Sequence, residues 1–127
     1  MSTDTPSPAP LLDTTRLAEE LEQFAEARNW AQFHSPKNLA MALAGETGEL
    51  VEIFQWMTEE QSKAAAQQPE TARAVRDELA DVLMYVVRLA DRLGVDLNEA
   101  VQYKLQLNGQ KYPVDKARNT SKKYDQL

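Results

Sequence analysis

Two pairs of acidic residues have the spacing of metal ligands on one side of a helix. Glu46 and Glu49 form a Glu-x-x-Glu pair, and Glu78 and Asp81 form a Glu-x-x-Asp pair. Residues three apart lie on the same side of an α-helix, so each pair presents two carboxylates in one direction. Such pairs are common on solvated helix surfaces, so the apolar residues around each pair decide whether it is unusual.

Both pairs lie at the apolar face of their helix. With about 100° per residue, six apolar residues fall within an arc of about 100°, namely Leu39, Leu43, Leu50, Ile53, Phe54 and Met57. Glu46 lies inside this arc and Glu49 at its edge. Six apolar residues fill a second arc of about 120° on the next helix, namely Leu79, Val82, Leu83, Val86, Leu89 and Leu93, with Glu78 at its border and Asp81 beside it. We therefore expect both pairs to face a seam between helices.

Four carboxylates at such a seam need a positive partner, because two unit charges 4 Å apart repel by roughly 4 kcal/mol at an effective dielectric constant of 20. The segment from Leu39 to Glu60 contains no basic residue, which favours a divalent cation over salt bridges. The chain has no Cys and one His, so we expect oxygen ligands, which suit Mg²⁺, or Mn²⁺ as a substitute, rather than zinc or copper. The predicted chemistry is attack of metal-activated water on a phosphoanhydride.

Four helices with recognisable ends must position these residues. A helix is predicted from about Thr14 to Arg28, a second from Pro36 to Thr58 after the N-cap Ser35, a third from Pro69 to Leu93 before Gly94, and a fourth after Asp96 to about Gln110. Residues 59–68 are interpreted as a connection. No segment alternates apolar and polar residues, so we predict an all-α, four-helix bundle-like fold that forms oligomers.

The 127 residues are enough for one domain, predicted over residues 13–127 after a disordered N-terminal lead-in, residues 1–12. The formal charge is −6, and it is uneven: residues 1–99 hold 18 acidic and 8 basic side chains, whereas residues 100–127 hold 2 and 6. The acidic body argues against binding to a nucleic acid polymer, and the basic tail suits a phosphate ligand. Without an apolar run long enough for a membrane span or a leader, we expect a cytoplasmic protein with no membrane partner.

Several segments in a fixed order resemble one family. The segments 45–56 (GETGELVEIFQW) and 77–85 (DELADVLMY) resemble the MazG-like all-α nucleoside triphosphate pyrophosphohydrolases, and are most similar to the dCTP pyrophosphatase branch. The resemblance extends from about Leu17 to Leu127 and includes residues 28–34, 37–39, 95–97, 111–113 and 121–124. It implies that Mg²⁺ is held by Glu46, Glu49, Glu78 and Asp81.

The resemblance also implies a reaction. A nucleoside triphosphate, dCTP or base-modified dCTP, would be hydrolysed between the α- and β-phosphates to the monophosphate and pyrophosphate, which removes unwanted nucleotides from the pool. A carboxylate would accept a proton from the attacking water, and both Glu49 and Glu52 are candidates for this catalytic base. Members of the family form homodimers or homotetramers, which agrees with the expected self-association.

Residues for the substrate follow from the same resemblance and from residue type. Trp30 and Trp56 are predicted to stack on the nucleobase, because an aromatic face binds a base with little regard to its identity. The other predicted substrate-binding residues are Lys37, Asn38, Tyr85, Asn108, Lys111, Tyr112, Lys122, Lys123 and Tyr124. His34 is interpreted as structural, and Phe33, Leu39 and Phe54 as packing residues.

Two alternatives remain open at this point. The chain could be a catalytically silent helical module for oligomerisation or nucleotide binding, which would bind metal and nucleotide without turnover. Within the enzyme class, a related dUTP or phosphoribosyl-ATP hydrolase is the other hypothesis, which the Trp-containing segments disfavour only by resemblance.

Overall fold

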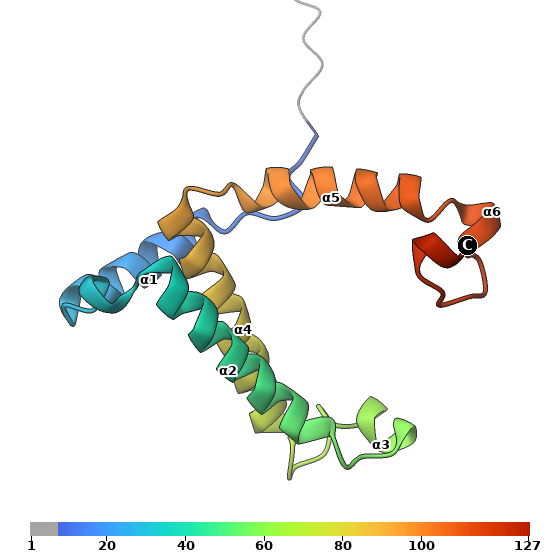
Figure 1. Cartoon of the computed structure of the whole chain (residues 1–127). Coiled ribbons are helices and arrows are strands. Elements are labelled where there is room, and N and C mark those ends of the chain that lie inside the picture. Colours follow the sequence, from blue (N-terminus) through green and yellow to red (C-terminus); the bar gives the residue numbers. More distant parts are fainter. Residues whose placement is uncertain (1–7) are drawn as a thin grey trace, which may run out of the picture. The chain divides into compact units, whose positions relative to one another are not determined.

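The computed structural model describes residues 8–127, and every regular element in this range is a helix. The elements in chain order are α1 (Thr15–Ala27), η1 (Ala31–Phe33), α2 (Pro36–Phe54), α3 (Glu59–Lys63), α4 (Ala72–Leu93), α5 (Leu97–Lys111), α6 (Val114–Ala117) and η2 (Tyr124–Gln126), where η denotes a 3₁₀ turn (Figure 1). The all-α prediction is confirmed. Residues 8–14 form no helix, and residues 1–7 of the predicted lead-in, 1–12, lie outside the described range.

Three predicted helix ends are confirmed by their capping geometry. The Ser35 hydroxyl oxygen accepts a hydrogen bond from the Asn38 backbone N–H at 3.2 Å, and Pro36 occupies the first turn of α2. Gly94 ends α4 in the left-handed conformation, with φ of 68°. Asp96 caps α5, because its carboxylate accepts from the Glu99 backbone N–H at 3.1 Å.

The segment between α2 and α4 differs from the prediction. Helix α2 ends at Phe54 rather than near Thr58, because Thr58 starts a separate short helix. Its hydroxyl accepts from the Gln61 backbone N–H, and the Gln61 side chain accepts from the Thr58 backbone N–H, which is a complete capping box. Helix α4 begins at Ala72 rather than at Pro69. The predicted connection therefore contains the short helix α3 and a series of turns.

The chain forms two compact units, and residues 14–95 form the first of them. Here α2 runs antiparallel to α4, and α1 packs on α4 (Figure 1). The buried apolar residues are Ala25, Leu39, Ala65, Val75, Val87 and Ala90. Leu39 is thus a core residue as predicted, whereas Phe33, also predicted to pack, is 59% exposed. The pairing of α2 with α4 is what brings the two acidic segments together.

The second unit contains residues 8–13 of the lead-in and residues 96–127. Its lead-in is hydrogen-bonded to α5 through Asn98. The Asn98 side-chain oxygen accepts hydrogen bonds from the backbone N–H groups of Leu11 and Leu12 at 2.9 and 3.2 Å. The basic tail contains α6 and η2, although its sequence has no helical periodicity. That residues 13–127 act as one domain stays a prediction. Within residues 8–127, no helix is long and apolar enough to cross a membrane.

Candidate active site

Three carboxylates meet where α2 packs against α4. Glu46 and Glu49 lie about one turn apart on α2, and Glu78 comes from α4. One carboxylate oxygen of each residue lies within 4.8 Å of the other two. The antiparallel helix pair therefore brings together three of the four carboxylates that the sequence analysis assigned to a metal ion.

This acidic cluster contains buried negative groups without a positive partner. The Oε2 atoms of Glu46 and Glu78 are buried and have no hydrogen-bond partner. The pKa of Glu46 is raised from 4.5 to about 7, first by the adjacent Glu78 carboxyl, with which it can share a proton, then by burial, by Glu49 and by the charge of Asp81. A proton or a cation must relieve this repulsion.

The acidic cluster fits a hard divalent cation. Carboxylate oxygens are the ligands that Mg²⁺ and Mn²⁺ prefer, and Mg²⁺ commonly keeps positions for water and phosphate oxygens beside one or two carboxylates. The unpartnered Oε2 atoms of Glu46 and Glu78 are acceptors that a cation would satisfy. Glu49 is more exposed than both, so water can reach its carboxylate.

Asp81, the fourth predicted ligand, connects the acidic cluster with a pocket. It lies three residues after Glu78 on α4, and its charge contributes to the raised pKa of Glu46. The half-buried Asp81 side chain also lines a pocket of about 310 Å³ in the same unit. The acidic cluster and this pocket are therefore neighbours along α4.

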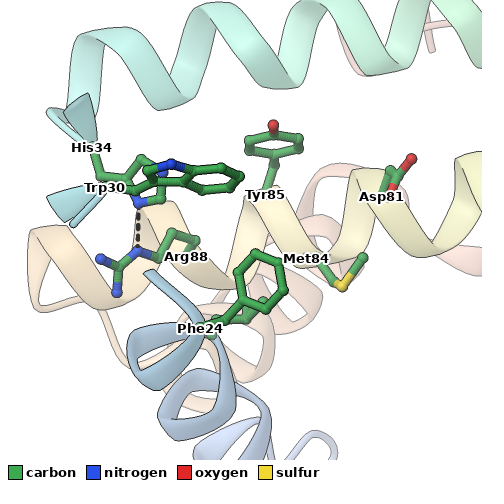
Figure 2. Close-up of a pocket in the computed structure, with 8 residues that line it drawn as sticks. Phe24, Trp30, His34, Asp81, Met84, Tyr85 and Arg88 are labelled. Carbon is green, nitrogen blue, oxygen red and sulfur yellow. Dashed lines mark hydrogen bonds between the residues drawn. The ribbon is translucent and has the colours of Figure 1, made fainter. Parts of the chain in front are cut away.

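Aromatic rings form much of the pocket wall. The Trp30 ring meets Phe24 edge to face, with ring centroids 5.7 Å apart, and meets His34 in the same way at 6.4 Å. Figure 2 shows Tyr85 on α4 beside Trp30, with Phe24 contributed by α1. The full lining is Leu21, Phe24, Trp30, His34, Asp81, Met84, Tyr85 and Arg88. Such a pocket suits a planar, partly polar ring.

One end of the pocket is built on a buried arginine. Arg88 is 3% exposed; its Nη1 forms an ion pair with Glu22, and its Nε–H donates to Nδ1 of His34 at 3.1 Å (Figure 2). The hydrogen bond from Arg88 is the main cause that lowers the pKa of Glu22. The pKa of His34 is also lowered, first by burial and then by the charges of Arg88 and Arg92, which keeps the ring neutral at pH 7.

Sequence reasoning found Trp30, Tyr85 and Asp81 but missed the rest of the pocket. Arg88 was not singled out, and His34 was interpreted as structural. A signal for Arg88 was present: on the helical wheel it falls within about 20° of Asp81, so it lies on the same side of α4. No wheel predicts its partners, because Glu22 and His34 belong to other segments of the chain.

Four further predicted site residues of this unit lie outside the pocket. Trp56 is 89% exposed, just beyond the end of α2. Glu52 is exposed on α2, and Lys37 is exposed in the first turn of that helix. The Asn38 side-chain amide donates to the carbonyl of Phe33 at 3.0 Å, so it helps to shape the connection before α2.

The remaining predicted substrate-binding residues belong to the second unit. Tyr112 and Tyr124 meet edge to face with ring centroids 6.2 Å apart, and the Lys111 ammonium lies 4.7 Å from the centroid of the Tyr124 ring. The other members are the half-buried Asn108 and the exposed Lys122 and Lys123. These six residues, called the tail cluster below, combine positive charge with aromatic rings, which suits a phosphate ligand.

Known proteins are similar to this chain over most of its length. dCTP pyrophosphatase 1 of Rattus norvegicus is 46% identical over 121 residues, which cover 95% of this chain and 70% of the rat protein. The human protein of the same name is 45% identical, with the same coverage of both chains. A crystal structure of a pyrophosphatase from Archaeoglobus fulgidus is 33% identical, with a TM-score of 0.73 over 85% of this chain and 99% of that one.

The model of the MazG-like family matches residues 41–127, a range that contains the acidic cluster and the tail cluster. The match agrees with the relatives in sequence and in fold. The predicted family and the predicted enzyme class, a pyrophosphohydrolase, are confirmed. This chain belongs to the MazG-like family.

Proposed function

We propose that this chain hydrolyses a nucleoside triphosphate, dCTP or a base-modified dCTP, between the α- and β-phosphates, with Mg²⁺ as cofactor. The products are the nucleoside monophosphate and pyrophosphate. The relatives named dCTP pyrophosphatase 1 support the substrate class, since they are about 45% identical over nearly the whole chain. The role that follows is removal of surplus or modified nucleotides from the pool.

The single observation that carries the proposal is that the aromatic pocket and the acidic cluster lie next to each other along α4. Asp81 lines the pocket and also acts on Glu46 in the acidic cluster. A nucleotide has a planar base at one end and charged phosphates at the other, so it needs these two environments side by side. The pocket volume, about 310 Å³, is at the lower end of the range of small-ligand sites, which suits one base rather than a whole nucleotide.

The acidic residues and the aromatic residues have distinct tasks in this scheme. Glu46, Glu49, Glu78 and Asp81 would hold Mg²⁺, which when bound offsets phosphate charge and polarises phosphoryl oxygens. Trp30 and Tyr85 bind the base, and their position fixes where the α-phosphorus lies relative to the carboxylates. Orientation of this kind is a large part of phosphoryl-transfer catalysis, because the transition state needs correctly placed charge more than covalent help.

The catalytic base is one of two glutamates on α2. Glu49 belongs to the acidic cluster and is exposed, so water can reach it. Glu52 is exposed three residues further along α2 and is not part of the acidic cluster. Glu49→Gln and Glu52→Gln separate these roles: loss of Mg²⁺ binding together with activity identifies a ligand, and loss of kcat with Mg²⁺ binding retained identifies the base.

We assign the tail cluster to the phosphates as part of the same proposal. Its lysines and tyrosines offer hydrogen-bond donors and positive charge, which a bound triphosphate requires beyond what Mg²⁺ neutralises. Lys37, Asn38 and Trp56 remain proposed substrate contacts, and their exposure in the single chain leaves them free to complete a site in an assembly. Lys122→Gln is expected to raise KM for dCTP more than it changes kcat.

Self-association as a homodimer or homotetramer belongs to the proposal as well. Large apolar side chains are exposed on the two helices that carry the carboxylates, namely Met41, Val51, Leu79 and Leu83. Burial of such side chains between copies of the chain would stabilise an assembly. Light scattering coupled to size-exclusion chromatography tests this directly, and a monomer at all concentrations contradicts it. A cytoplasmic location is the corresponding proposal for the compartment.

The reaction is tested by incubating the protein with a panel of nucleotides and following the products by ³¹P NMR. The panel is dCTP, 5-methyl-dCTP, dUTP, dTTP, dATP and ATP, each with Mg²⁺ and with EDTA. Pyrophosphate and dCMP from dCTP, only with Mg²⁺, are expected. Orthophosphate with dCDP refutes the assigned bond. Bound nucleotide without turnover identifies a silent binding module instead, and a preference for dUTP identifies the related hydrolase.

A further inference from the structure

Arg88 and its partners form a buried polar network that the proposed reaction does not use. The Arg88 guanidinium contacts Glu22 on α1 and His34 in the connection before α2, while Arg88 itself belongs to α4. Burying a charged group is unfavourable unless it is paired and hydrogen-bonded. The network therefore ties three segments of the chain together at one end of the pocket.

The hydrogen bond to His34 determines where the imidazole carries its proton. An arginine side chain is always protonated in proteins, so its Nε–H is a donor and Nδ1 of His34 must be the acceptor. A neutral imidazole whose Nδ1 accepts has its proton on Nε2. His34 lines the pocket and its ring meets Trp30, so this tautomer offers an N–H donor at the pocket wall.

We propose that Arg88 is a positioning residue of the nucleotide site: it holds His34 in the tautomer with the proton on Nε2, so that this N–H donates to an acceptor atom of the bound nucleobase. This inference rests on the proposed function for the identity of the ligand. Cytosine has two such acceptors, the ring nitrogen N3 and the carbonyl O2. Trp30 would supply stacking, and His34 would add a directional contact.

One further contact and the charges around His34 support a positioning role. The backbone carbonyl of His34 accepts from Nε of Arg92 at 3.2 Å, so both the ring and the backbone of this residue are fixed from α4. Burial and the two neighbouring guanidinium groups lower the pKa of His34, and only Glu22 opposes them. A charged imidazole, which could not accept from Arg88, is disfavoured for the same reason.

The first test reads the tautomer directly by long-range ¹H–¹⁵N NMR. His34 is the only histidine in the sequence, so its ring signals need no assignment. At neutral pH we expect a protonated Nε2 and an unprotonated Nδ1 in the wild type, and a mixture of tautomers in Arg88→Lys, which keeps the charge beside Glu22 but loses the Nε donor. A proton on Nδ1 in the folded wild type overturns the proposal.

The second test uses two His34 variants with opposite defects. In His34→Asn the amide lies near the Nδ1 position, where it can still accept from Arg88, but nothing reaches the Nε2 position. In His34→Gln the amide N–H reaches the Nε2 position. In His34→Asn we expect KM for dCTP to rise about tenfold and kcat to change less than about twofold. In His34→Gln we expect KM to rise less than about threefold.

Arg88→Lys is expected to raise KM by less than His34→Asn, because part of the imidazole keeps its proton on Nε2, and the double variant no more than His34→Asn, because both act on one contact. Arg73→Lys is the matched control, since Arg73 forms a solvent-exposed ion pair with Asp77 on the same helix. Unchanged KM in folded His34→Asn contradicts the proposal, and this result does not depend on whether Arg88→Lys folds.

A titration with dCMP separates this inference from the proposed reaction. If dCTP is not hydrolysed, the proposed function fails, while a shift of the His34 Nε2 signal on binding dCMP still supports the positioning role. Hydrolysis of dCTP without any change of the His34 signal on saturation with dCMP overturns the inference and leaves the proposed function standing.

Discussion

Helix α4 contains buried polar charge at two places, and the two are arranged in opposite ways. Near its start, Glu78 meets Glu46 and Glu49, and two buried oxygens have no partner. Near its end, the buried Arg88 has its charge balanced by Glu22 and donates its Nε–H to His34, while its Nη2 has no hydrogen-bond partner. The first place contains like charges that need a cation, whereas the charge of the second is balanced within the protein. Under the proposed function, the unbalanced charge belongs to the reacting end of the site and the balanced charge to its scaffold.

Removing one carboxylate from the acidic cluster should have the largest effect. Glu46→Gln should lower kcat/KM for dCTP by on the order of 1000-fold, about 4 kcal/mol, because the cation loses a ligand at the reacting phosphate. The fold should survive, and the melting temperature in EDTA should rise, since like-charge repulsion is relieved. Asp81→Asn should likewise lose activity.

The matched control for these variants is Glu60→Gln, whose carboxylate is exposed and paired with Lys63 at 3.0 Å. It should leave both activity and melting temperature unchanged. Steady-state kinetics and thermal unfolding on the same preparations provide the comparison. Wild-type turnover in Glu46→Gln would remove this residue from the metal site.

Removing the Arg88 guanidinium should mainly lower the free energy of unfolding. Arg88→Gln leaves Glu22 without its partner in a half-buried position, and breaking a buried pair costs about 3–5 kcal/mol; we expect about 3 kcal/mol because Glu22 is partly solvated. Arg73→Gln removes an exposed arginine–carboxylate pair from the same helix and should cost less than about 0.5 kcal/mol. Urea unfolding measures both, and equal losses would refute the contrast between the two arginines.

The pocket lies between the two places, and Trp30 tests its role in binding the base. Trp30→Leu should raise KM for dCTP about tenfold, which corresponds to loss of one stacked aromatic ring, with little change of kcat. Phe33→Leu is the control, because Phe33 belongs to the same connection and is not part of the pocket lining. A KM unchanged in Trp30→Leu would place the base elsewhere.

The acidic cluster should also cause a pH dependence of stability in the absence of metal. The pKa of Glu46 is about 7 in the folded protein against an ordinary value of 4.5, so between these values the native state binds a proton that the unfolded chain has lost. The contribution of Glu46 to the free energy of unfolding is therefore highest below about pH 4.5 and decreases as pH rises toward 7. Relative to Glu46→Gln, the wild type should lose stability across this window.

The stabilising contribution of His34 changes with pH in the opposite direction, so the wild type must be compared with Glu46→Gln to isolate the effect of Glu46. The pKa of His34 is lowered on folding, so its stabilising contribution is present above pH 6.5, the ordinary value, and is lost as the pH falls below it. Because Glu46→Gln retains His34, the difference between the two proteins isolates Glu46. A difference that stays constant from pH 4.5 to 7 in EDTA would contradict the raised pKa.

The acidic cluster could be predicted from the sequence far better than the Arg88 network, for a physical reason. A carboxylate such as Glu46 within an apolar arc violates the pattern of its own helix, so one helix suffices to notice it. In the Arg88 network the charge is balanced by Glu22 and a hydrogen bond goes to His34; both residues lie on other segments, and only tertiary packing brings them together. The pocket half that comes from α1 was missed for the same reason.

The errors in helix boundaries also have local causes. Proline at position 69 is compatible with a helix start, but the Thr71 hydroxyl donates to the Ala65 carbonyl and holds this stretch in turns until Ala72. At the end of α2, the pair Thr58 and Gln61 forms a capping box that competes with continuation of the helix. Both errors lie away from the acidic cluster, so the predicted juxtaposition of carboxylates was unaffected.

The most direct test of the central claim is calorimetric titration with Mg²⁺ at pH 7 in two buffers of different ionisation enthalpy. If the acidic cluster binds the cation, binding must displace the proton from the protonated fraction of Glu46, about half at pH 7, so the observed heat should depend on the buffer and report net proton release. Glu46→Gln should bind Mg²⁺ more weakly and release no proton. Mg²⁺ binding that is independent of the buffer and equal in both proteins, or no binding at all, would contradict the account.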